Sequence, residues 1–123
     1  MSAIKLYTGC ISYRGKDKLD ITVWKANTAA GQLLKPSWDI VNGHKYEGLS
    51  DEAYTKAYFE MVNKRYLNNI GNQQILRNLL NQDELTLCCF CNASKFCHRH
   101  LAMYIMIEIA ERRNIPYVFM GER

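Results

Sequence analysis

The sequence predicts a small three-layer α/β domain with a mostly parallel sheet of about four strands. Three observations predict this class. Strand-like segments alternate along the chain with segments of helical periodicity. The chain has 123 residues, the usual size of one domain, so residues 1–123 are treated as a single unit. The most apolar strand, Glu84 to Cys91, does not alternate, so we expect it at the centre of the sheet with both faces covered.

The first half of the chain predicts two strands and a long connection. Residues 3–10 have the pattern of an opening strand that ends near Gly9. Residues 21–24 are β-branched and aromatic, which favours a short second strand. Residues 26–48 are irregular and interrupted by Gly and Pro, which predicts a long loop with one helical turn over 37–41.

The second half predicts three helices and two strands. Ser50 is followed by two acidic residues, the usual start of a helix. Aromatic and apolar residues then recur at helical spacing: Tyr54, Tyr58, Met61, Val62 and Tyr66. Residues 75–80 mark a shorter helix. After the central strand, residues 97–113 form the last helix, and residues 117–120 form a final strand beyond Pro116.

Composition limits the possible partners. The net charge of +4 is compatible with an anionic ligand, but there is no run of basic residues, so direct binding to nucleic acid is not expected. No apolar run is long enough to span a bilayer and no signal peptide is visible, so the expected location is the cytoplasm. The five cysteines are an odd number, which argues against a disulfide framework and favours reduced thiols.

The chemistry gathers where the central strand ends and the last helix begins. Cys97, His98 and Arg99 stand at the predicted helix start, after a loop that contains Lys95 and Phe96. The first N–H groups of a helix have no intrahelical partners and attract anions. Ligands of open parallel sheets bind outside the carboxyl ends of the strands, so we expect the functional site at this junction.

The sequence resembles the family called domain of unknown function 488, in its short phage- and bacterium-encoded branch. The resemblance extends over nearly the whole chain and is most specific at the Cys-His-Arg junction. It rests on Leu6–Thr8, Lys35–Trp38, Ser50–Tyr66, Leu85–Cys91, Phe96–Arg99 and Tyr117–Glu122. The resemblance implies a compact α/β fold, and the family offers no established reaction to transfer to this chain.

The first functional hypothesis is a pocket that holds a phosphorylated small molecule, a nucleotide or nucleotide-derived signal, without turnover. Arg99 would bind phosphate, and Trp38, Tyr7 or Phe96 would stack on a base. The predicted ligand-binding residues are Thr8, Cys10, Ser12, Lys35, Ser37, Trp38, Cys91, Lys95, Phe96 and Arg99.

Three further hypotheses stay open. The first is an enzyme acting on nucleotides or nucleic acid, a hydrolase or glycosyl-transfer enzyme, with Cys97 and His98 as catalytic residues. The second is an interaction module stabilised by zinc, whose ligands would be Cys89, Cys91, Cys97 and His98; otherwise no cofactor is expected. The third concerns assembly: the last helix is apolar on more than one side, so its second face would pack on the middle helix or form the seam of a homodimer.

Overall fold

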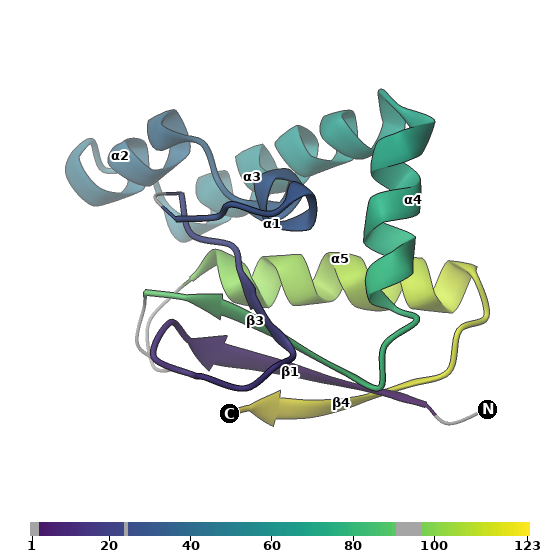
Figure 1. The fold of residues 1–123 in the computed structure, drawn as a ribbon. Helices are drawn as coiled ribbons and strands as arrows, with labels where there is room; N and C mark the ends of the chain where they lie inside the picture. Colours follow the sequence, from purple (N-terminus) through teal and green to yellow (C-terminus); the bar gives the residue numbers. More distant parts are fainter. Residues whose placement is uncertain (1–2, 24, 91–96) are drawn as a thin grey trace.

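The predicted α/β class and the four-stranded parallel sheet are confirmed. A computed structural model describes residues 3–23, 25–90 and 97–123 (Figure 1). All strand pairs in the sheet are parallel, and the strand order is β2-β3-β1-β4. The strands are β1 (Ile4–Cys10), β2 (Lys18–Asp20), β3 (Glu84–Cys89) and β4 (Tyr117–Glu122).

The helices are α1 (Ala29–Leu34), α2 (Trp38–Tyr46), α3 (Asp51–Leu67), α4 (Ile70–Leu79) and α5 (His98–Arg112). α5 packs directly on β1 and β3, and α3 packs on α5. Figure 1 shows the resulting layers as the sheet, α5 above it, and α3 beyond α5. No helix within the described residues is long and apolar enough to cross a membrane.

Two predictions about the first half of the chain are wrong. The second strand lies at residues 18–20 instead of 21–24, because the Asp20 carboxylate accepts hydrogen bonds from the backbone N–H and hydroxyl of Thr22, at 2.9 and 2.7 Å, and turns the chain there. Residues 26–48 contain two helices instead of one helical turn, since Thr28 and Ser37 each cap a helix.

The handedness of parallel connections explains which face of the sheet the helices cover. Both connections that contain helices, β2 to β3 and β3 to β4, move the chain across the sheet in the same direction. Right-handed crossovers therefore place all the helices on one face. The connection from β1 to β2, residues 11–17, moves in the opposite direction and covers the other face.

A polar and aromatic network fills this second face. The guanidinium carbon of Arg123 lies 3.6 Å from the centre of the Tyr7 ring and 4.9 Å from that of Tyr13. Asp17 accepts hydrogen bonds from the hydroxyls of Thr86 and Tyr13, at 2.5 and 2.7 Å. Burial raises the pKa of Asp17, but these hydrogen bonds outweigh it and hold that pKa below its usual range. β3 is thus buried on both faces, as predicted.

Candidate functional site

The carboxyl ends of the strands and the start of α5 form one edge of the molecule. In the register of the parallel pairs, Cys10 at the end of β1 lies beside Cys89 at the end of β3. Cys97, the N-cap residue of α5, is bonded to Cys89 through its sulfur. The edge therefore brings together residues from three separate parts of the sequence, as the sequence analysis predicted for a parallel sheet.

Arg99 lies inside this edge. Its side chain is fully buried at 0% exposure. Its Nη1 lies 3.0 Å from the Cys89 sulfur, and its Nε donates to Glu122 Oε1 at 3.2 Å. The hydroxyl of Thr8 donates to the same carboxylate oxygen at 2.5 Å. The Arg99 guanidinium is thus buried at the carboxyl ends of the strands, and the Glu122 carboxylate balances its charge.

The structure pairs the sulfurs of Cys89 and Cys97, which differs from the expected reduced thiols, although their Cα atoms, 7.7 Å apart, lie farther apart than the usual range of about 4.4–6.8 Å for a disulfide. The odd number of cysteines describes the whole chain, whereas these two meet because a strand end and a helix start adjoin in the fold. Both residues are buried, with exposures of 1% and 3%. In this oxidised state Cys97 has no free thiol, so it cannot act as a nucleophile.

His98 is buried beside these sulfurs. Its Nε2 lies 2.6 Å from the carbonyl oxygen of Ile21. Because a carbonyl oxygen accepts, Nε2 carries the proton, and Nδ1 presents a lone pair toward the Cys97 sulfur, 3.9 Å away. Burial lowers the pKa of His98 to about 4, and the positive charge of Arg99 adds to this effect. The imidazole is therefore neutral at pH 7, and its proton is already donated to the backbone.

Cys10 is the free, partly exposed thiol of the edge among the described residues. The backbone N–H of Ser12 lowers the pKa of this thiol by hydrogen bonding to its sulfur, and this outweighs the opposing effect of burial. Cys88, the other free cysteine described, points to the opposite face of the sheet beside Gly9. Burial raises the pKa of Cys88 to about 11.

We expect iodoacetamide to alkylate Cys10 at least about 100-fold faster than Cys88 at pH 8. The two pKa values lie at least about two units apart, so the reactive thiolate fractions differ by that factor. Peptide mapping by mass spectrometry, without a reductant, would give both rates. The protein unfolded in guanidinium is the control, because there the rates should converge. Similar rates in the folded protein would contradict the assignment.

The remaining predicted ligand-binding residues are more dispersed. Ser12 is exposed next to Cys10. Lys35 ends α1, and its carbonyl accepts a hydrogen bond from Arg65 at 2.7 Å. Ser37 caps α2, which packs on α3, and Trp38 is 45% exposed at the start of that helix. Cys91, Lys95 and Phe96 lie outside the described residues.

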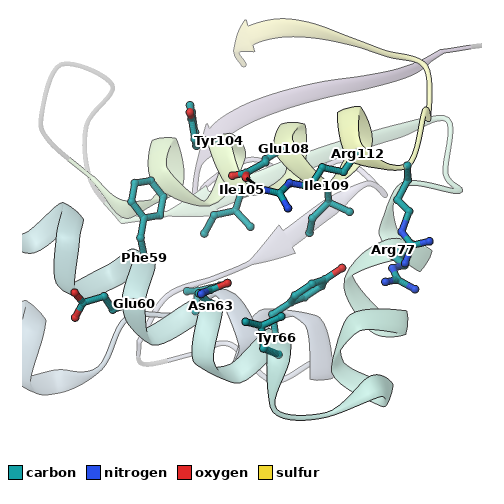
Figure 2. A pocket seen from close by; sticks show the side chains of 13 residues that line it. Phe59, Glu60, Asn63, Tyr66, Arg77, Tyr104, Ile105, Glu108, Ile109 and Arg112 are labelled. Carbon is teal, nitrogen blue, oxygen red and sulfur yellow. Dashed lines mark hydrogen bonds and ion pairs between the residues drawn. The ribbon is translucent and has the colours of Figure 1, made fainter.

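A groove of about 640 Å³ lies between α3, α5 and Arg77 of α4 (Figure 2). Its walls include Phe59 and Tyr66 from α3, and an ion pair of 2.8 Å between Glu108 and Arg112 lies along α5. None of the predicted site residues lines it. The groove is therefore separate from the carboxyl edge of the sheet.

Sequence reasoning missed Glu122 as a site residue, although the resemblance to the family included it. The final strand was expected to end at Met120, whereas β4 continues to Glu122. The extension places the carboxylate beside Thr8 in the sheet register and within reach of Arg99. No local signal identified it, because Gly121 separates Glu122 from the apolar segment 117–120 and its contact with Arg99 depends on the register of the sheet.

The fold and the edge define a small α/β protein with a parallel sheet and a Cys-His-Arg helix start at its carboxyl edge. A family model described as the active DUF488-N3 subclade matches residues 15–109, which is most of the chain. The chain belongs to this family of domain of unknown function 488. No curated protein and no solved structure matches it.

Proposed function

We propose that the protein binds a phosphorylated small molecule of the nucleotide class at the carboxyl edge of its sheet and holds it without turnover. The observation that carries the proposal is the start of α5. The side chain of its N-cap residue, Cys97, makes no capping hydrogen bond. The other helices are each capped by a side-chain oxygen, from Thr28, Ser37, Ser50 and Asn69. The Cys97 backbone carbonyl accepts from the His100 N–H at 3.2 Å, and a phosphate oxygen would supply the further acceptor that a side chain supplies in the other helices.

Two further observations support an anion at this edge. The lowered pKa of Cys10 means that the surrounding groups, the Ser12 N–H first among them, favour negative charge at the end of β1. Arg99 contributes a permanent positive charge in the first turn of α5. Because Arg99 already pairs with Glu122, it would attract the ligand through its charge alone. Direct contact between Arg99 and phosphate would require this ion pair to break.

The test adds a negative charge next to the proposed phosphate position. His100 is exposed in the first turn of α5. Glutamate at this position suits the helix dipole, so folding should be preserved. The new carboxylate would lie a few ångströms from the bound phosphate and repel it, so His100→Glu should weaken the binding of nucleoside monophosphates about tenfold. Isothermal titration of the whole chain with ribonucleoside monophosphates, the matching nucleosides and inorganic phosphate would measure the affinities.

Gln74→Glu is the matched control, because it adds the same charge on an exposed position of α4. This variant should bind as the unmodified protein does. The nucleosides should bind at least about tenfold more weakly than their monophosphates, since they lack the group that the α5 start recognises. The proposal fails if none of these probes binds, or if both variants bind equally well.

A second candidate is an enzyme that acts on the same class of ligand. The observation that favours it is the Cys10 thiol, which is partly exposed and has a lowered pKa. These are the properties of a nucleophilic cysteine, and Cys97 lacks them while it is bonded to Cys89. The alkylation experiment described above measures the reactivity that this candidate requires.

A further inference from the structure

The buried junction between β3 and α5 also has the composition of a metal site. We propose that, when Cys89 and Cys97 are reduced, these two thiolates and His98 Nδ1 bind a zinc ion. One ligand atom from each of the three residues lies within 4.8 Å of the others, and all three residues are buried. Thiolate sulfur and imidazole nitrogen are the usual ligands of zinc in proteins. The proposal does not depend on the binding of a phosphorylated ligand.

The orientation of His98 supports the site. A histidine that binds a metal through one ring nitrogen usually donates the other N–H to a carbonyl or carboxylate, which fixes the ring and the tautomer. Here Nε2 lies 2.6 Å from the Ile21 carbonyl oxygen, a partner supplied by the segment after β2. Nδ1 is thereby left as the acceptor and faces the Cys97 sulfur.

The backbone spacing of the two cysteines agrees with a shared metal. Their Cα atoms lie 7.7 Å apart. Bonded cysteines usually have Cα atoms about 4.4–6.8 Å apart. Two thiolates on one tetrahedral zinc ion stand about 3.8 Å apart, because each Zn–S bond is about 2.3 Å long. Two sulfurs that share a zinc ion are farther apart than two sulfurs in a disulfide, and this suits the 7.7 Å between the Cα atoms of Cys89 and Cys97.

The charges around the junction balance with zinc bound. A divalent cation with two thiolates is neutral, and Arg99 with Glu122 is a second neutral pair. Buried ionic groups are tolerated when they are compensated in this way. Arg99 Nη1, 3.0 Å from the Cys89 sulfur, would also donate a hydrogen bond to the thiolate.

Zinc and the disulfide exclude each other, since both use the same sulfur atoms. Reduction adds two electrons and two protons to the Cys89–Cys97 pair. Zinc then displaces both protons when the thiols bind it as thiolates. A phosphine reductant supplies the electrons in the experiment, so the metal-binding step itself involves no change of oxidation state.

The experiment loads the reduced whole chain with zinc, removes excess metal by gel filtration and measures zinc by elemental analysis. We expect about one zinc ion per chain, as for other cysteine–histidine sites. Cys97→Ser and His98→Gln should each lower the retained zinc at least about tenfold. Cys88→Ser is the matched control, because Cys88 faces the other side of the sheet, and it should retain zinc fully.

Cobalt(II) gives a second readout, independent of affinity. The reduced protein should show a thiolate-to-cobalt charge-transfer band that weakens in Cys97→Ser and is unchanged in Cys88→Ser. Circular dichroism of each variant would confirm that it is folded. A reduced protein that retains no zinc would overturn the proposal. Equal zinc in Cys97→Ser, His98→Gln and the unmodified protein would also overturn it, because the metal would then lie elsewhere.

Discussion

Replacing Glu122 by alanine should lower the free energy of unfolding by about 3 kcal/mol, because it leaves the Arg99 charge buried without its carboxylate partner. Arg99 is 0% exposed and donates to Glu122 Oε1 at 3.2 Å, and the Thr8 hydroxyl donates to the same oxygen. Both donors lose their acceptor in this variant. Chemical denaturation at pH 7, followed by circular dichroism, would measure the change.

Two further variants separate charge from hydrogen bonding. Glu122→Gln keeps an acceptor oxygen and removes the charge, so it should be less damaging than alanine. In an Arg99→Met background no buried charge is left, so Glu122→Ala should cost less than about 1 kcal/mol there. If the alanine substitution is equally costly in both backgrounds, its effect does not come from the ion pair, and Glu122 has some other structural role.

The meeting of the strand ends and the start of α5 at one edge could be predicted, because it follows from topology. Parallel strands end at one edge, and a helix that follows a central strand must start there. The alternation of strand and helix patterns was sufficient to place Cys97 at this edge, and Cys10 as well once the first strand is parallel to the central one. The order of the strands was not needed for that inference, since all of them point the same way.

The partners within the site could not be predicted, because they depend on tertiary register. Whether Arg99 meets a phosphate or a carboxylate depends on where β4 ends relative to β1, and a bulge between Leu6 and Tyr7 shifts that register. The Ile21 carbonyl reaches His98 because Asp20 turns the chain just after β2. Neither contact has a local sequence signal.

The two helices in residues 26–48 were missed for a related reason, since capping by Thr28 and Ser37 outweighed the irregular composition there.

The neutral His98 should make the metal-free protein lose stability as the pH falls from 7 to 4. The ordinary pKa of the imidazole is 6.5, and burial first, then the Arg99 charge, lowers it to about 4 in the folded protein. Between these values the unfolded chain binds a proton that the folded chain does not, so unfolding becomes more favourable as the pH decreases. The difference in pKa corresponds to a loss of about 3 kcal/mol across this window.

Denaturation curves of the whole chain, with a chelator present, at pH 7, 6, 5 and 4 would measure this loss. His98→Gln stays neutral at every pH, so its stability should change much less between pH 7 and 4. His100→Gln is the matched control: burial also lowers the pKa of His100, but this side chain is exposed, so the variant should keep most of the pH dependence. Asp17 has a pKa below its usual value of 3.8, so its contribution is lost mainly below this window.

Equal pH dependence in His98→Gln and the unmodified protein would mean that His98 is protonated at its ordinary pKa. The placement of Nδ1 toward the Cys97 sulfur comes from the hydrogen bond between Nε2 and the Ile21 carbonyl, so that result would leave the geometry of the proposed zinc site unchanged.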